Sequence, residues 1–169
     1  LSNLAIDPIW GGSRAQVGVD TSVLGEIAVV VTNSAAPIGS LYWFGNNPNN
    51  NWDLATTLNW AYGADYFYSG DGVIFDDNGQ TNVVNLTSAL VPGSVTFNNN
   101  SQTYTLSGSG KITGSAGVTV NNNGAVILAT DNDYSGGTTL NSAGATLQIG
   151  DNNSHGNIGA GDVVFTSGA

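Results

Sequence analysis

The sequence contains no cysteine and no methionine, and only two of its 169 residues, Arg14 and Lys111, carry a positive charge. Without cysteine there is no disulfide framework, no thiolate zinc site and no cysteine nucleophile. Against 12 acidic residues the two cations leave a formal net charge of −10. So few cations cannot neutralise a phosphate backbone or an anionic membrane surface, which excludes nucleic-acid binding and electrostatic attachment to membranes.

Long apolar runs are also missing. The longest, at 27–31, is far shorter than the roughly 20 residues that span a bilayer, so no membrane insertion is predicted. The chain does not open with a basic and apolar leader, and we expect any signal peptide to have been removed from a longer precursor. The scarcity of cations and the abundance of Asn, Gly and Thr indicate an extracellular or bacterial cell-surface protein.

Strong helix formers are nearly absent, because Glu, Lys, Arg and Gln are few while Thr, Val, Asn and Gly dominate. Hydrophobic residues still make up 40% of the chain, which is enough to bury a core and argues against disorder. The composition therefore predicts an all-β protein.

Three stretches differ in pattern along the chain. In 1–40, two strands are predicted at 16–19 and 26–32, and this segment is either the tail of an upstream β-sandwich or a β cap for the remainder of the chain. The stretch 41–78 holds ten of the 15 aromatic residues between Asn-rich and Gly-rich turns, and is interpreted as a lead-in.

The third stretch, 79–169, is periodic. A first series of apolar pairs consists of Val84/Leu86, Tyr104/Leu106, Val126/Leu128 and Leu147/Ile149, with steps of 20, 22 and 21 residues between second members. A second series consists of Val95/Phe97, Val118/Val120, Thr138/Leu140 and Val163/Phe165. Because a spacing of two places both side chains on one face of a strand, each pair predicts a strand with one buried face.

A repeat of about 21 residues made of short strands and tight turns is typical of a β-solenoid, in which stacked coils bury a shared interior. We predict about three to four coils at 79–169. One interior row should consist of Leu86, Leu106, Leu128 and Ile149, and a second of Phe97, Val120, Leu140 and Phe165. An antiparallel sandwich with strands every 10 to 12 residues gives similar spacing and is the alternative. The Asn runs at 98–100 and 121–123 lie about one coil apart and predict a ladder at one corner.

The segment 133–140 reads Asp-Tyr-Ser-Gly-Gly-Thr-Thr-Leu and continues at 145–150 as Ala-Thr-Leu-Gln-Ile-Gly. This resembles the autotransporter-associated β-strand repeat, whose pattern is a Tyr, a Gly-Gly-Thr-Thr core and a Gly-Thr-Leu followed by a glycine-rich ending. The resemblance covers 50–169 and is most specific at 131–164. It implies a right-handed parallel β-helix in a large exported bacterial protein, and it brings no catalytic residues.

No catalytic site is predicted from the residues themselves. Asp76 and Asp77 are adjacent, so on a strand they point to opposite faces and cannot act as a carboxylate pair. Lys111 has no Asp near it in the sequence, and His155 lies in a turn without a second His. Asp131 and Asp133 offer hard oxygen ligands two residues apart and are weak candidates for structural calcium. The favoured interpretation is that they are ordinary turn carboxylates, so no metal site is predicted. No other cofactor is predicted.

The aromatic residues are the candidates for binding. Sugars stack on exposed aromatic rings while Asn and Asp bond their hydroxyl groups, and the 49–68 region mixes these residue types. The candidates for carbohydrate binding are Trp52, Trp60, Tyr62, Tyr66 and Tyr68. Aromatic residues of a small β domain also serve as core or end-cap packing, which is the competing interpretation.

These observations predict a non-catalytic β-solenoid segment of a larger bacterial surface or secreted protein, acting as a structural and adhesive scaffold. One alternative is a carbohydrate-binding module of a polysaccharide-degrading enzyme. Another is a self-assembling subunit of an extracellular fibre, because an open solenoid end exposes strand edges that invite stacking.

Overall fold

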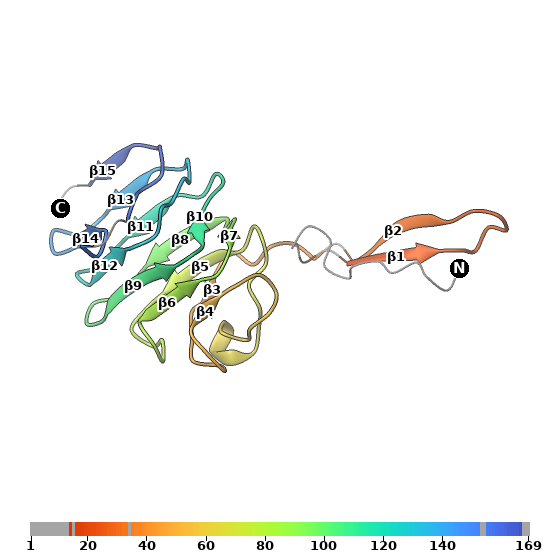
Figure 1. Ribbon diagram of the computed structural model, residues 1–169, viewed down its shortest axis with the longest axis horizontal. Coiled ribbons are helices and arrows are strands. Elements are labelled where there is room, and N and C mark those ends of the chain that lie inside the picture. The colour runs from red at the N-terminus through yellow and green to blue at the C-terminus, as the bar shows by residue number, and fades with distance from the viewer. Residues whose placement is uncertain (1–13, 15, 34, 153–154, 167–169) are drawn as a thin grey trace.

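The computed structural model describes residues 14, 16–33, 35–152 and 155–166. Parallel strands stack into a β-solenoid of about four turns, so the predicted all-β solenoid is confirmed and the sandwich is excluded (Figure 1). A 3-10 turn, η2 (Ala61–Gly63), interrupts the strands. Within the described ranges, no helix is long and apolar enough to cross a membrane.

Three parallel sheets form the sides of the solenoid. The first contains six strands, which in spatial order are β15 (Val163–Phe165), β13 (Thr138–Leu140), β11 (Val118–Val120), β8 (Ser94–Phe97), β5 (Gly72–Phe75) and β3 (Leu41–Tyr42). The second contains β14 (Thr146–Ile149), β12 (Ala125–Leu128), β9 (Thr103–Gly108), β6 (Val83–Leu86) and β4 (Asn51–Trp52). The third pairs β10 (Lys111–Ile112) with β7 (Ala89–Leu90).

The alignment of the row predicted in the six-stranded sheet is confirmed, but its last member, Phe165, lies at the open end and is 65% exposed. Phe97 pairs with Val120, Val120 with Leu140 and Leu140 with Phe165, all in parallel register. Phe75 extends this row at the other end, where its ring stacks on that of Phe97 with centroids 4.9 Å apart. Each coil therefore contributes one large apolar side chain to a continuous core, as the two-residue period requires.

The row predicted in the five-stranded sheet is wrong at its first member. Leu106 pairs with Leu128, and Leu128 pairs with Ile149, as expected, although Ile149 is 43% exposed in the last coil of this sheet. Leu86, however, pairs with Gly108, and Val84 takes the place beside Leu106. The coil between β6 and β9 is 22 residues long, whereas Leu86 and Leu106 are only 20 apart. Leu86 is still fully buried, because both residues of the pair face the interior.

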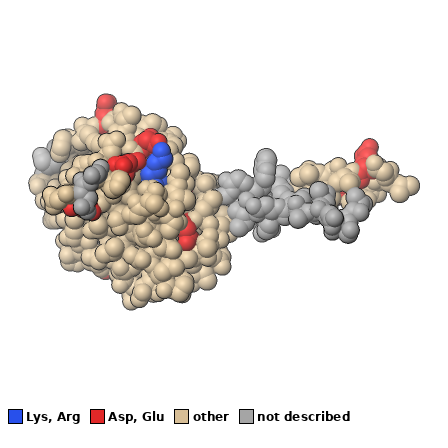
Figure 2. Space-filling view, viewed as in Figure 1, with Lys and Arg blue, Asp and Glu red and all other residues tan. Residues whose placement is uncertain are grey.

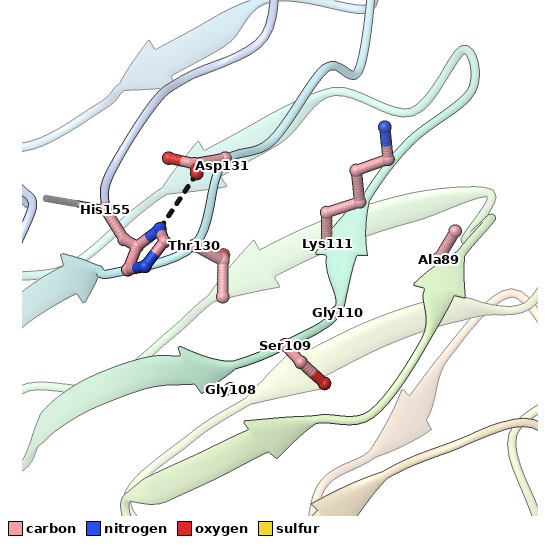
Figure 3. Close-up of a pocket in the computed structure, with 8 residues that line it drawn as sticks. All are labelled: Ala89, Gly108, Ser109, Gly110, Lys111, Thr130, Asp131 and His155. Carbon is pink, nitrogen blue, oxygen red and sulfur yellow. Dashed lines mark hydrogen bonds and ion pairs between the residues drawn. The ribbon is translucent and has the colours of Figure 1, made fainter.

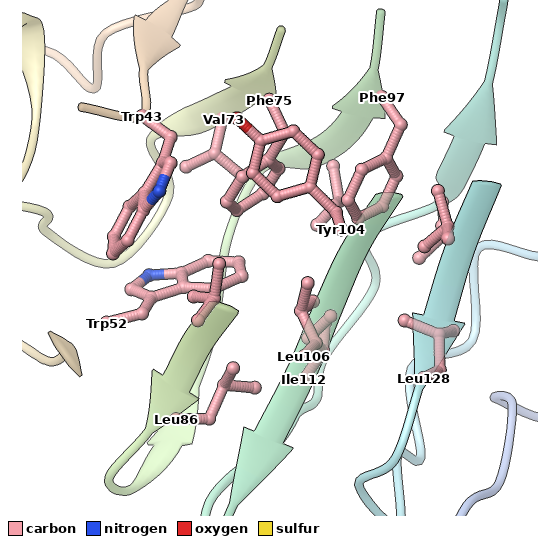
Figure 4. Close-up of a cluster of buried hydrophobic side chains, with 14 of the residues drawn as sticks. Trp43, Trp52, Val73, Phe75, Leu86, Phe97, Tyr104, Leu106, Ile112 and Leu128 are labelled. Atoms are coloured by element: carbon pink, nitrogen blue, oxygen red, sulfur yellow. The ribbon is translucent and has the colours of Figure 1, made fainter. Parts of the chain in front are cut away.

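The solenoid also begins earlier than the repeat predicts. β3 and β4 belong to the two large sheets, so the stretch 41–78 forms the first coil as well as covering it. The buried rings of Trp43 and Trp52 pack against Phe75 (Figure 4). Trp60 also packs against Phe75, and Phe67 packs on Trp52 and Trp60, so that these rings together close this end of the core. At the opposite end β15 has no strand beyond it among the described residues, and 65% of Phe165 is exposed.

The described part of 1–40 is an antiparallel hairpin of β1 (Gln16–Asp20) and β2 (Ala28–Asn33). It projects away from the solenoid, so the first coil is closed by the aromatic side chains and not by this hairpin (Figure 1). Val23, Leu24, Ile27 and Val29 are exposed on it.

Candidate functional site

The structure separates the five aromatic binding candidates into two groups. Trp52 and Trp60 are 0% exposed, so neither can offer a ring face to a sugar, and the binding prediction is wrong for both. Trp60 lies edge-on to Trp43 and Trp52, with ring centroids 5.0 and 5.4 Å away. The physical reason is the open end of the core, which must be covered by large apolar groups. For these two residues the packing interpretation holds.

The three tyrosines lie nearer the surface. Tyr62 is 69% exposed in η2, where its ring meets the edge of Phe44 with centroids 6.0 Å apart. Its φ of 61° lies in the left-handed region, which is unusual for a residue other than glycine. Tyr66 and Tyr68 are half-buried and meet edge to face. Tyr62 is therefore the one candidate that presents most of its ring to solvent.

Arg14 attaches the N-terminal region to the first coil. Its guanidinium donates to Asp71 at 2.9 Å and to Asp65 at 3.1 Å, and lies 4.7 Å from the ring centre of Tyr68. The Asp71 side chain is 0% exposed and also accepts the backbone N–H of Ile38. Burial opposes the charge of Arg14, but the two carboxylates outweigh this effect and raise its pKa above the ordinary value. This cluster is a structural tether.

The two calcium candidates are held by different partners. The Asp133 carboxylate pairs with Lys111. The Asp131 carboxylate lies 3.0 Å from Nδ1 of His155 and accepts the backbone N–H of Gly156. In the described part of the chain, no three carboxylate or imidazole groups are grouped so that they could hold a metal ion. The structure therefore does not bring Asp131 and Asp133 together as a calcium site.

These ion pairs border a cavity of about 440 Å³ on the third side of the solenoid (Figure 3). Its lining residues are Ala89, Gly108, Ser109, Gly110, Lys111, Thr130, Asp131 and His155. The single lysine and the single histidine of the chain thus lie at one hollow. Small residues form much of its lining, which leaves room between the longer side chains.

The partners of Lys111 and His155 were missed because they lie one coil away in sequence. Lys111 and Asp133 are 22 residues apart, and His155 and Asp131 are 24 apart. The sequence did contain a signal for these pairs, because residues separated by about one coil length lie side by side once the coils stack. Hydrogen bonding to Asp131 raises the pKa of His155, and hydrogen bonding to Lys111 lowers the pKa of Asp133. Figure 2 shows basic side chains beside acidic ones on a face that is otherwise largely uncharged.

The predicted asparagine ladder is present at the end of the six-stranded sheet. Asn121 donates from Nδ2 to Oδ1 of Asn98 at 2.8 Å, and Asn141 donates to Oδ1 of Asn121 at 2.7 Å. Thr166 continues the ladder by donating to Oδ1 of Asn141 at 3.1 Å. Side-chain ladders of this kind hold stacked strands in register and keep a sheet from twisting.

Comparison of the chain with models of known protein families, with curated proteins and with solved structures finds no match.

Proposed function

We propose that this chain is a non-catalytic β-solenoid segment of a larger exported bacterial protein, in which it serves as a structural and adhesive scaffold. The observation that carries this proposal is the continuous stack of inward-facing side chains, in which Phe75, Phe97, Val120, Leu140 and, at the open end, Phe165 succeed one another coil by coil. A stack of this kind makes each coil depend on its neighbours and yields a stiff rod.

The polar groups of the cavity support a structural role more than a chemical one. Asp131 and Asp133 are each engaged with a cation-forming side chain, so neither is poised as a general acid or base. Both pairs connect neighbouring coils and add to the stack. The exported bacterial location rests on the composition and on the resemblance at 131–164 to a repeat of exported proteins.

The proposal is tested with beads coated with the chain and held under flow on glass and on polysaccharide films. Folded wild type should retain more beads than Leu128→Asp, because burying an unpaired carboxylate costs several kcal/mol, which is of the order of the whole stability of a domain. Ile127→Asp is the matched control, since Ile127 is the outward neighbour in the same strand and is only half-buried. It should retain beads like wild type.

Two results would contradict the scaffold. One is equal retention by wild type and Leu128→Asp. The other is release of sugar products from xylan, mannan, β-glucan or cellulose by the purified wild type, which would show an enzyme.

A second candidate function is carbohydrate binding, and the exposed ring of Tyr62 is the observation that favours it. Residues in sparsely populated backbone regions cluster at binding sites, and Ala61 and Tyr62 both have positive φ. If this ring binds sugar, Tyr62→Ala should lose retention in a polysaccharide affinity gel while unfolding like wild type. Absence of retention by the folded wild type on all four polysaccharides would remove this candidate.

A further inference from the structure

The outward face of the six-stranded sheet carries a repeated Thr-x-Asn motif. It occurs at 96–98, 119–121 and 139–141, in three successive coils. The strand register aligns Thr119 with Thr96 on one side and with Thr139 on the other. Because side chains two residues apart share a face, the threonines form one outward rank and the asparagines form a second rank parallel to it.

Both ranks are held at fixed positions. The threonines lie on hydrogen-bonded parallel strands, whose spacing is about 4.8 Å, and the ranks are separated by two residues, or about 6.6 Å along the strand. The asparagine amides are locked to one another by the ladder bonds of 2.8 and 2.7 Å. The face is therefore a two-dimensional polar lattice with little freedom left to lose on binding.

The hydroxyl groups of this lattice are free. Thr96, Thr119 and Thr139 are half-exposed, and their hydroxyls have no hydrogen-bond partner among the residues that the structure describes. Each can therefore bond a group outside the protein.

Over β8, β11 and β13 the face is also uncharged, although the chain carries a net charge of −10. In the preceding coil Asp76, the residue after β5, takes the place that Asn98 has beside β8. The outward positions of β8 are Ser94 and Thr96, and the central strands β11 and β13 present threonine and then asparagine just beyond the strand. Aromatic residues are absent from the outward positions of β8, β11 and β13. Beyond these three strands the threonine row continues through Ile74 to Tyr42 on one side and to Val164 on the other. A partner recognised here must be neutral, rich in hydroxyl or water oxygens, and regular at the same spacing.

We infer that this face adsorbs to ice. The two repeats of the lattice, about 4.8 Å between neighbouring strands and about 6.6 Å along a strand, are close to oxygen–oxygen spacings that recur on faces of hexagonal ice. Each bond from a threonine or asparagine to lattice water replaces a bond to liquid water and contributes little by itself. Many such bonds made together by a rigid face act as a multivalent contact. The strength of binding therefore depends on how regularly the threonine and asparagine groups are spaced. The three threonine strands carry no outward ring, and Tyr42 lies two strands away from Thr96, so the centre of the lattice offers no aromatic platform to a polysaccharide.

The test is partition into ice grown slowly from a dilute solution of the whole chain, measured by tryptophan fluorescence of the melted ice and of the remaining liquid. Wild type should enter the ice, whereas serum albumin should be excluded. Thr119→Tyr places a bulky ring in the centre of the lattice, and its ice fraction should fall about tenfold or more because several contacts are lost together.

Thr105→Tyr is the matched control. Thr105 is an outward, half-buried threonine at the centre of the five-stranded sheet, where its register partners are Val83 and Ile127. Its row is not a threonine rank, so Thr105→Tyr should enter ice like wild type. If circular dichroism shows that Thr119→Tyr is unfolded, Thr119→Val takes its place, because valine keeps the shape and the strand propensity and removes only the hydroxyl. It should also reduce the ice fraction.

Exclusion of wild type from ice to the level of albumin would overturn the inference. So would equal partition of wild type and the folded Thr119 variant. Retention of wild type on crystalline cellulose together with exclusion from ice would assign the face to a polysaccharide instead. The scaffold proposal does not depend on any of these results.

Discussion

Replacing Trp60 by alanine distinguishes packing from binding at the aromatic end of the solenoid. Trp60 is 0% exposed, and its ring lies within 6 Å of four other aromatic rings, at 5.0, 5.4, 5.8 and 5.9 Å between centroids. Truncation of a buried tryptophan costs about 3–5 kcal/mol, since the cavity that remains closes only in part. Each lost aromatic pair costs about 0.5–1.5 kcal/mol more than the loss of buried area alone. The destabilisation by Trp60→Ala should therefore lie at the upper end of the range of about 3–5 kcal/mol.

The assay is equilibrium unfolding in guanidinium chloride monitored by far-ultraviolet circular dichroism. For a chain of this size, a loss of 3–5 kcal/mol corresponds to a melting temperature lower by about 6–20 °C. Tyr62→Ala is the control at the same end of the molecule, because 69% of Tyr62 is exposed. Its stability should stay within about 0.5 kcal/mol of wild type. A loss of less than about 1 kcal/mol for Trp60→Ala would refute the argument that this ring closes the core.

The charged groups and the exposed end of the solenoid lead to three further predictions. Arg14→Ala should lower the free energy of unfolding by about 3 kcal/mol, because it leaves the fully buried Asp71 without its cation, and an unchanged denaturation midpoint would contradict this. The pKa of His155 measured by NMR should lie above 6.5 and should fall in Asp131→Asn, because Asp131 is the main cause of the rise and Asp151 a smaller one. Because this pKa is raised, the His155–Asp131 pair stabilises the fold below pH 6.5, and the stabilisation is lost as the pH rises through the folded-state pKa. A His155 pKa that does not change in Asp131→Asn would contradict the pairing. Light scattering should show a mass that rises above the 17.2 kDa monomer with concentration and falls in Phe165→Ser, whereas a constant monomer mass would argue against assembly through β15.

Features that depend on local alternation were predicted correctly from the sequence. The apolar pairs two residues apart identified the buried face of most strands, because side chains on a strand alternate between its two faces. Their recurrence about every 21 residues predicted parallel stacking, and the row from Phe97 to Phe165 formed as expected. The asparagine ladder was predictable for the same reason, since Asn98 and Asn121 occupy equivalent places in successive coils.

Features that depend on how coils meet were predicted incorrectly or missed. The alignment of Leu86 with Leu106 failed because the register between coils is set by main-chain pairing and turn length, and not by the apolar pair alone. Tryptophan surrounded by Asn and Asp in the sequence fits a sugar site and an end cap equally well. Only the stacked structure shows that Trp60 covers the first coil.

The sequence by itself thus determined the fold class, the approximate coil length and the side chains that face inward, because these depend on composition and on the two-residue period of a strand. The tertiary structure decided which aromatic rings are buried, which carboxylate meets Lys111 or His155, and which threonines align on one outward face. These features join residues about one coil apart, and their geometry exists only once the backbone hydrogen bonds between coils have set the register.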